Sequence, residues 1–308
     1  MTQNVFYSNG KLLLSAEYLV LDGAKALAVP TVFGQTLKVE YTNQSIVEWN
    51  SLDSDGSVWY NAQFSVSEII ENKTKAQDAV TKKLIEILHH AHRLSSVVLQ
   101  NHKGFKVETK LSFPKNWGLG TSSTLINNIA QWFGVSAFEL LDASFGGSGY
   151  DIACAQNNSP IVYQKIKEKP FVTPVAFNPT FKENLFFVYL NQKQNSTNAI
   201  ASYKNHQHKA IKYMPQINAI TALMQNATSG KEFGKLMQEH EVILSHILES
   251  ETVKEQLFPD FNGFIKSLGA WGGDFIMVAS KENPKEYFKQ KGFDTFLTYA
   301  EMVKTFQL

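Results

Sequence analysis

Residues Phe113–Ser123 read Phe-Pro-Lys-Asn-Trp-Gly-Leu-Gly-Thr-Ser-Ser. They follow a predicted strand, Phe105–Leu111, in which apolar and polar residues alternate, and they lead into a predicted amphipathic helix, Ser122–Phe133. Glycines let the backbone approach an anion closely, and the first turn of a helix adds unpaired N–H donors and a partial positive charge. This order of strand, glycine turn and helix indicates a phosphate-binding turn.

The turn matches neither of the two best-known nucleotide motifs. No lysine follows its second glycine, as a Walker A loop requires, and the G-x-G-x-x-G spacing of a dinucleotide fingerprint is absent. A helix N-cap is the structural alternative, because Thr or Ser after a glycine turn is a common cap. These residues alone support the cap and the phosphate turn about equally.

Composition and charge limit the classes of function. The chain has 308 residues, of which 44% are hydrophobic and 19% charged, and its net charge is +1. This balance predicts no binding to nucleic acid or to an anionic membrane. Its single cysteine, Cys154, excludes an intrachain disulfide. The first residues lack the pattern of a signal peptide, and the apolar runs are shorter than a membrane helix needs, so we expect a cytoplasmic protein.

The predicted elements mix strands and helices without strict alternation. Short strands are expected at Val5–Tyr7 and Lys11–Ser15 around a Ser8-Asn9-Gly10 turn. Later elements include the strand Leu185–Leu190, the helices Ser196–His206, His208–Gln225 and Lys231–Glu249, and the strand Phe275–Ala279. This arrangement favours an α+β fold over a doubly wound sheet. A shift in composition near residues 170–182 predicts a domain boundary there.

Three glycine-containing segments follow one another along the chain. They are Gly10–Val20, Pro114–Ser123 and Lys266–Gly273. In this order they resemble the motifs of the GHMP kinases, the superfamily of galactokinase, homoserine kinase, mevalonate kinase and phosphomevalonate kinase. The first two motifs are written G-K-x-x-[L/I]-x-G-E-[H/Y]-x-V and P-x-x-x-G-L-G-S-S. The resemblance spans nearly the whole chain, and three matches in order are more specific than one glycine turn.

The resemblance implies a two-domain GHMP kinase fold. A ribosomal protein S5 domain 2-like, ATP-binding N-terminal domain would cover residues 1–175, and a ferredoxin-like C-terminal domain would cover residues 176–308. It also implies an ATP-dependent kinase that uses Mg²⁺ and transfers the γ-phosphate to a hydroxyl or phosphate of a small metabolite. The partner would be this small-molecule substrate, and the oligomeric state stays open between monomer and homodimer.

The same resemblance assigns roles to individual residues. Asp151 would accept the proton of the substrate hydroxyl, and Lys11 would pair with Asp151 and with the γ-phosphate. Ser122 would ligate Mg²⁺. The residues implied for binding ATP and its phosphates are Asn116, Trp117, Gly118, Leu119, Gly120, Thr121, Ser122 and Ser123. Those implied for binding the substrate are Glu17, Tyr18, Gly269 and Ala270.

The segment Gly149–Ala153 favours one branch of the superfamily. It resembles the Gly-x-Asp segment of mevalonate and phosphomevalonate kinases, which points to isoprenoid precursor synthesis. The choice between these two substrates stays open, as does an acidic Mg²⁺ ligand, for which Glu139 and Asp142 are the nearby acids. One alternative is a diphosphomevalonate decarboxylase-like enzyme. The other is a catalytically altered nucleotide-binding homologue, because Trp271 departs from the small residues of the third motif.

Overall fold

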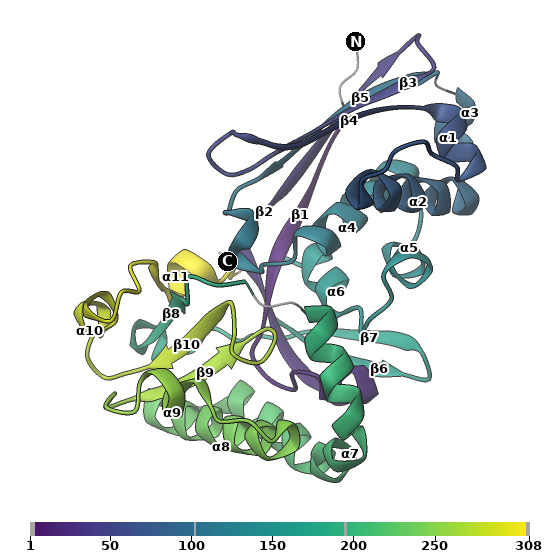
Figure 1. Cartoon of the computed structure of the whole chain (residues 1–308). Helices are drawn as coiled ribbons and strands as arrows, with labels where there is room; N and C mark the ends of the chain where they lie inside the picture. The colour runs from purple at the N-terminus through teal and green to yellow at the C-terminus, as the bar shows by residue number, and fades with distance from the viewer. Residues whose placement is uncertain (1–3, 102, 194–195, 306–308) are drawn as a thin grey trace. The chain divides into compact units, whose positions relative to one another are not determined.

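The computed structural model describes residues 4–101, 103–193 and 196–305 (Figure 1). The chain divides into two compact units. Unit 1 comprises Met1–Gly10, Phe33–Lys115 and Leu119–Gln156, and unit 2 comprises Lys11–Val32, Asn116–Gly118 and Asn157–Leu308. The domain boundary that the sequence predicts after residue 175 stays a prediction.

Unit 1 is built on a sheet with the strand order β4-β3-β5-β2. The strands are β4 (Val58–Ser65), β3 (Ile46–Leu52), β5 (Gly104–Leu111) and the later part of β2 (Ala26–Thr42). Strand β3 pairs antiparallel with β4 and parallel with β5, and β5 pairs antiparallel with β2. Alternate residues of β3 are buried, and β5 follows nearly the same pattern, as a sheet with one covered face requires.

Helices cover the buried face of this sheet (Figure 1). They are α1 (Val66–Glu71), α2 (Ala79–Leu94), α3 (Val97–Asn101), α4 (Thr121–Phe133), α5 (Ala137–Ser144) and α6 (Tyr150–Gln156). In α2 the buried residues Leu84, Ile87, Leu88 and Ala91 follow helical spacing and form the stripe that packs on the sheet. The resulting core fixes the position of α4, the helix that follows the glycine turn Gly118–Gly120.

Unit 2 contains a second sheet with the antiparallel order β11-β8-β10-β9. Its strands are β8 (Leu185–Tyr189), β9 (Phe264–Leu268), β10 (Phe275–Ala279) and β11 (Phe296–Thr298). The helices α7 (Ser196–Asn226) and α8 (Gly230–Leu248) pack on each other, and α8 lies against β9 (Figure 1). Shorter elements of unit 2 are η1 (Leu19–Asp22), β6 (Ile161–Ile166), β7 (Lys169–Pro174), η3 (Lys182–Asn184), α9 (Val253–Leu257), α10 (Lys285–Gln290) and α11 (Tyr299–Met302).

Two long strands belong in part to each unit. They are β1 (Asn4–Leu13) and β2, whose residues Ala26–Ala28 pair with β6 while Gln35–Thr42 pair with β5. A short helix, η2 (Lys115–Trp117), lies where the chain passes between the units again. The chain crosses the division after residues 10, 32, 115, 118 and 156, which makes five crossings.

The α+β class is confirmed, and two local predictions are wrong. The Ser8-Asn9-Gly10 turn does not exist, because β1 runs through it without a break. Ser8 is fully buried, and its hydroxyl bonds Asn128 Oδ1 at 2.7 Å, so a tertiary partner satisfies a polar residue inside a strand. The two helices predicted after Ser196 are one helix, α7.

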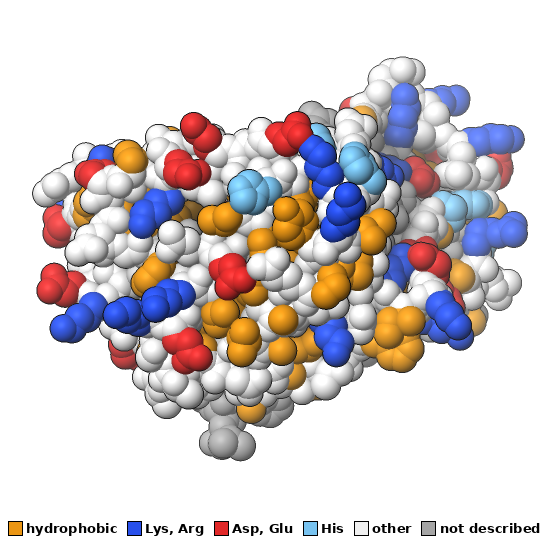
Figure 2. All heavy atoms as spheres, turned by 90° about the horizontal axis from the view of Figure 1, so that it is seen from below, with side chains coloured by type: hydrophobic (Ala, Val, Ile, Leu, Met, Phe, Trp, Pro, Cys, Tyr) orange, Lys and Arg blue, Asp and Glu red, His pale blue; other side chains and the backbone are white. Residues whose placement is uncertain are grey.

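On the face drawn in Figure 2, acidic and basic side chains lie among hydrophobic ones. None of the described helices is long and apolar enough to cross a membrane.

Candidate functional site

The helix α4 starts in a way that suits an anion. Its N-cap is Gly120, in the left-handed conformation with φ 96°, and Thr121 is its first helical residue. No side chain caps the first turn, so its backbone N–H groups point outward as donors. The alternative in which Thr or Ser caps this helix is therefore wrong. The glycine is needed because other residues rarely adopt this conformation.

The hydroxyl groups of the first turn have different surroundings. Ser123 Oγ donates to the carbonyl of Gly120 at 2.9 Å, and Thr124 Oγ1 donates to Gln35 Oε1 at 2.9 Å. Both hydroxyls therefore have partners within the protein. Thr121 is half-buried and Ser122 is exposed, which leaves Ser122 as the residue of this turn that reaches solvent.

A cavity of about 310 Å³ lies beside this helix start within unit 1. Thr121, Ser122 and Leu125 of α4 form one part of its wall. The rest of the wall comes from the sheet, from α2 and from Phe145; these residues are Gln35, Trp49, Ser51, Trp59, Tyr60, Ala79, Val80, Lys83, Leu84, Ile87 and Thr109. Cavities of this size, mostly apolar with a few polar groups, are typical of small-molecule sites.

Two aromatic side chains give this cavity a polar edge and a flat wall. The rings of Trp59 and Tyr60 lie 5.9 Å apart, and Lys115 Nζ lies 5.4 Å from the Trp59 ring. Within the described residues, the buried indole N–H of Trp59 has no hydrogen-bond partner. Since a buried donor without an acceptor costs free energy, this N–H is suited to a polar atom of a ligand.

The predicted catalytic pair falls in different units. Asp151 is the second residue of α6 in unit 1, and its side chain is half-buried. Lys11 is on β1, among the residues assigned to unit 2, and is also half-buried. Their pairing, and the roles given to both residues, stay predictions.

In unit 2, Gly118 packs directly on a carboxylate. Gly118 has φ 68°, and a Cβ placed on it would come 1.9 Å from Asp274 Oδ2. Asp274 is 8% exposed and directly follows the third glycine segment. Trp117 packs edge-on against Phe275 with ring centroids 5.4 Å apart, and Tyr189 donates to the carbonyl of Asn116 at 3.3 Å. Strands β8 and β10 thereby fix these residues of the turn.

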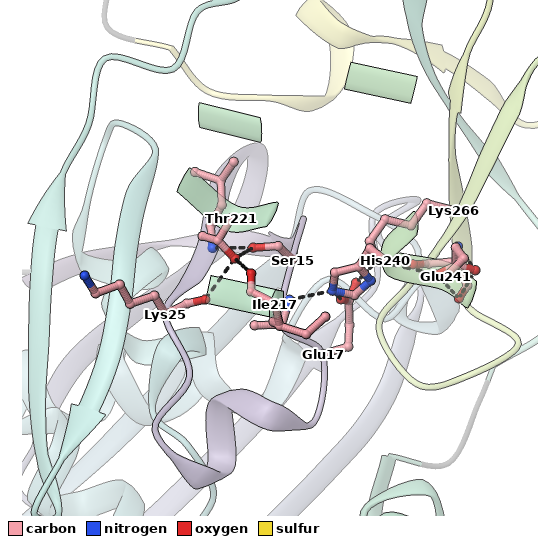
Figure 3. Close-up of polar contacts among 11 residues, drawn as sticks. Ser15, Glu17, Lys25, Ile217, Thr221, His240, Glu241 and Lys266 are labelled. Atoms are coloured by element: carbon pink, nitrogen blue, oxygen red, sulfur yellow. Dashed lines mark hydrogen bonds and ion pairs between the residues drawn. The ribbon is translucent and has the colours of Figure 1, made fainter. Parts of the chain in front are cut away.

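The first motif is held residue by residue in unit 2. Ser15 Oγ bonds Thr221 of α7 at 2.8 Å, and the Ala16 N–H donates to His240 Nε2 of α8 at 2.8 Å. Glu17 pairs with Lys266 of β9, and the Trp271 N–H donates to Tyr18 Oη at 2.6 Å (Figure 3 shows the first three of these contacts).

Two residues of this segment have a backbone conformation that they rarely adopt. Ala16 has φ 64° and Tyr18 has φ 63°, both in the left-handed region. Non-glycine residues at such angles persist where their surroundings determine them, which happens most often at functional sites. Ala16 stands where the first motif of the GHMP kinases has glycine. The four contacts from α7, α8, β9 and the glycine turn supply that constraint.

A set of buried charged groups lies at the centre of these contacts, and we call Glu17, His240, Glu241 and Lys266 the buried ion cluster. Each is at most 3% exposed. Lys266 Nζ contacts Glu17 Oε1 and lies 3.7 Å from Glu241 Oε1. Glu241 also accepts hydrogen bonds from Ser267, from its N–H at 3.1 Å and from its Oγ at 3.1 Å.

Burial shifts the ionisation of this cluster. It raises the pKa of Glu241 to about 7 and also raises the pKa of Glu17, while Lys266 opposes both shifts. Burial lowers the pKa of His240 well below its usual value, and the charge of Lys266 lowers it further. His240 is therefore neutral near pH 7. Burial also raises the pKa of Tyr18 to about 12, so this phenol stays protonated.

The substrate residues predicted from the sequence have mixed surroundings. Glu17 is buried in the ion cluster, and Tyr18 is buried and stacked on Tyr203 with centroids 5.2 Å apart. Gly269 is half-buried with φ 88°, and Ala270 is buried. Their roles toward a substrate stay predictions.

Sequence reasoning missed the cavity and the partners of Glu17. His240 and Glu241 stand at helical spacing within the apolar stripe of α8, between Met237 and Leu244. Two polar residues in such a stripe signal a buried polar contact. No pattern of that kind marks Trp59, Lys83 or Phe145, which come from separate elements. Among the described residues, no group of three or more acidic, His or Cys side chains is placed to hold a metal ion.

We expect Gly118→Ala to destabilise the protein by about 2 to 4 kcal/mol. About 1 kcal/mol comes from the left-handed backbone, and the rest comes from the clash with Asp274. Gly56→Ala is the matched control, because Gly56 has φ 85° with nothing within 4 Å of a Cβ, and it should cost only the backbone part. Urea unfolding of both variants measures this. Equal losses in the two variants would contradict the packing of Asp274 on Gly118.

Comparisons with known proteins bear on the fold. No family model matches the chain, and no curated protein matches it. Solved structures do. The Methanococcus jannaschii mevalonate kinase has a TM-score of 0.69 at 14% identity, with 96% of this chain and 98% of that chain covered. The Streptococcus pneumoniae phosphomevalonate kinase in complex with phosphomevalonate and AMPPNP has a TM-score of 0.69 at 14% identity, covering 96% and 99%. The Lactococcus lactis galactokinase complexed with galactose has 0.67 at 13%, covering 98% and 95%. The chain therefore has the fold of the GHMP kinases.

Proposed function

We propose that the protein is an ATP-dependent kinase of a small metabolite. One observation carries the proposal: the residues Thr121 and Ser122, at the open N-terminus of α4, also line the cavity of unit 1. A helix end suited to phosphate and a cavity suited to an apolar, flat group thus belong to one site. A nucleoside triphosphate has both parts.

In this proposal the base of ATP lies in the cavity. The indole of Trp59 and the phenol ring of Tyr60 supply aromatic surface, and the Trp59 N–H supplies a donor for a ring nitrogen. The Lys83 ammonium, which also pairs with Glu86 at 2.8 Å, adds a cation to the wall. The phosphates lie over the first turn of α4, along the predicted turn from Asn116 to Ser123.

Ser122 is the residue of this turn that would hold Mg²⁺, because its hydroxyl is the exposed one. Mg²⁺ in kinases is held mostly by substrate phosphates and water, with one or two protein ligands. The donor set therefore fits an ion that arrives with the nucleotide. The candidates for an acidic ligand, Glu139 and Asp142, are both exposed on α5, and neither is assigned. The ion would neutralise charge on the phosphates.

Transfer of the phosphoryl group depends on the positions of the reactants and on neutralisation of their charge more than on covalent catalysis by the protein. Asp151, in the first turn of α6, is proposed to accept the proton of the substrate hydroxyl. Lys11 is proposed to stabilise the charge on the transferred phosphoryl group. Glu17, Tyr18, Gly269 and Ala270 are proposed to face the substrate, with Glu17 acting through its place in the buried ion cluster.

We propose mevalonate or phosphomevalonate as the substrate, and isoprenoid precursor synthesis in the cytoplasm as the setting. The first motif, the Gly-x-Asp segment and the third glycine segment support this branch. Two of the similar structures named above, a mevalonate kinase and a phosphomevalonate kinase in complex with phosphomevalonate and AMPPNP, are in accord with this choice.

A second candidate is a nucleotide-binding relative that does not turn over a substrate. The contact of the Trp271 N–H with Tyr18 Oη favours it, because a backbone donor of the third glycine segment already has an acceptor there. A substrate panel with Mg-ATP, containing mevalonate, phosphomevalonate, homoserine and sugars, separates the two. We expect ADP release with one of the first two. Stabilisation by ATP with no phosphorylated product from any of them would favour the second candidate.

Filling the cavity should block the nucleotide. Ala79 lines the cavity from the start of α2, so Ala79→Trp places an indole where the base is proposed to lie. We expect the Kd for ATP to rise at least tenfold, measured by calorimetric titration. Lys82→Trp is the matched control, because Lys82 is an exposed residue of α2 outside the cavity wall. Unchanged ATP binding in Ala79→Trp would remove the base from this cavity.

Replacing the proposed base should separate binding from transfer. Asp151→Asn keeps the size of the side chain but removes the carboxylate that would accept a proton, so we expect turnover to fall at least a hundredfold. The Kd for ATP should stay within about twofold of the wild-type value, because Asp151 has no part in the cavity wall. Turnover and ATP titration are measured on the same preparation. A fully active variant would take Asp151 out of the mechanism.

A further inference from the structure

The buried ion cluster contains one carboxylate more than its cation can neutralise. Within the buried ion cluster, Glu17 and Glu241 share one ammonium, that of Lys266, and all three side chains are at most 3% exposed. Outside the cluster, the charge of Lys11 on β1 also favours the ionised form of Glu17. With both carboxylates ionised the cluster would hold a net charge of about −1 away from water, which proteins avoid by binding a proton.

His240 does not hold this proton. Its Nε2 accepts the Ala16 N–H at 2.8 Å, so this nitrogen carries no hydrogen, and the ring is the neutral tautomer protonated on Nδ1. In a doubly protonated ring, the Nε2–H donor would face the Ala16 N–H donor, which is repulsive. The extra proton therefore belongs to one of the two carboxylates.

The distances favour Glu241. Glu17 Oε1 is in direct contact with Lys266 Nζ, whereas the nearer oxygen of Glu241 is 3.7 Å from it. The direct ion pair and the charge of Lys11 stabilise the ionised form of Glu17 more, and its other oxygen, Oε2, lies 3.3 Å from His240 Nε2. When protonated, Glu241 still accepts the Ser267 N–H through one oxygen, and its own O–H has Ser267 Oγ within reach.

The groups around Glu241 come from each neighbouring element. Lys266 lies on β9, Glu17 and Tyr18 lie in the first motif, and His240 precedes it on α8. Strand β10 has only apolar residues, Phe275–Ala279. On α7, Lys209 and His206 pair with Glu249 at the C-terminus of α8, away from the cluster.

The cluster joins two segments that the proposed reaction needs. Its members hold Ala16 and Glu17 of the first motif, and Lys266 and Ser267 stand directly before the turn at Gly269. We propose that Lys266 and Glu241 are positioning residues of the substrate site, and that Glu241 holds a proton that keeps the buried ion cluster neutral. The positioning role rests on the proposed function, because it assumes that a substrate binds here. The protonation of Glu241 does not, because it follows from the fold alone.

Because Glu241 holds a proton in the folded protein, the stability of the protein should fall as the pH rises. The pKa of Glu241 is about 7 in the folded protein and 4.5 in the unfolded chain. Between these values the folded state binds a proton that the unfolded state does not. The stabilisation is complete below pH 4.5 and is lost as the pH rises through 7.

Unfolding in urea between pH 5 and 8 tests this without any activity. Relative to Glu241→Gln, which is a permanent mimic of the neutral side chain, the unfolding constant of the wild type should rise with pH by up to about tenfold per pH unit, the limit for one proton. Glu239→Gln on the exposed side of α8 is the matched control and should follow the wild type. Lys266→Met removes the cation of the buried ion cluster. A change in its stability therefore reports on folding and not on which carboxylate holds the proton.

Two results would overturn the assignment of the proton. One is a Glu241→Gln variant whose stability follows pH as the wild type does. The other is a loss of the pH dependence in Glu17→Gln with its retention in Glu241→Gln, which would place the proton on Glu17.

The positioning role has its own readout once the panel has identified the substrate. Above pH 7 the wild-type cluster becomes negative next to the glycine turn, so the KM for an anionic substrate should rise at least threefold between pH 6.5 and 8.5 relative to Glu241→Gln, while the ratio of their kcat values stays constant. Equal pH profiles of KM would overturn the positioning role. An inactive panel would overturn the proposed function and leave the unfolding result standing.

Discussion

The ammonium of Lys266 is fully buried in unit 2, at 0% exposure, and must be neutralised inside the protein. The conformation of unit 2 around it depends on this requirement. Desolvation of such a charge costs several kcal/mol, which only close partners with good geometry return. Glu17 and Glu241 are these partners, and they come from the first motif and from α8. Because an unpaired partner would be far more costly than the pair, the three segments that supply these residues have little freedom to move apart. The left-handed angles of Ala16 and Tyr18 persist inside this constraint.

In unit 1 the important features are the start of helix α4 and the cavity beside it. The N-cap of its helix α4 is Gly120, which has no side chain to accept from the first backbone N–H groups, so these donors are open to an anion. The cavity beside it is lined by residues of α2 and by Trp49, Trp59 and Tyr60 of the sheet. Aromatic walls and helix donors together suit a ligand with one flat apolar end and one anionic end. Each unit therefore carries a separate part of the proposed chemistry.

The fold was largely accessible from the sequence, because glycine patterns and hydrophobic periodicity are local signals. Strand β10 begins and ends at the predicted residues Phe275 and Ala279, and α4 differs from its predicted range by one residue at its start. Ser8 and Asn9 misled the prediction, because polar residues inside a strand look like a turn until the buried partner, Asn128, is known. The break predicted within α7 is absent, because the polar residues around His206 are solvated helix surface rather than a boundary.

The site was accessible only in part. The phosphate turn is contiguous in sequence, so its glycines and hydroxyls were named in advance, yet Ser123 bonds its own helix and Ser122 is the exposed hydroxyl. The residues of the cavity wall come from β2, β3, β4, β5, α2, α4 and Phe145, so no single segment of the sequence predicts it. The partner of Glu17 lies 249 residues away, a separation at which single-sequence patterns carry no information.

That separation also orders the assembly of the chain during synthesis. All residues of unit 1 have been made once Gln156 has left the ribosome, whereas residues 11–32 of unit 2 must wait for β8, β9 and β10. Until Lys266 is made, Glu17 lacks its ion-pair partner and is more stable in water than buried. Contacts of such long range close slowly, because a large loop must be ordered first. The first motif, although it is synthesised near the start, is thus among the last segments to reach its final conformation.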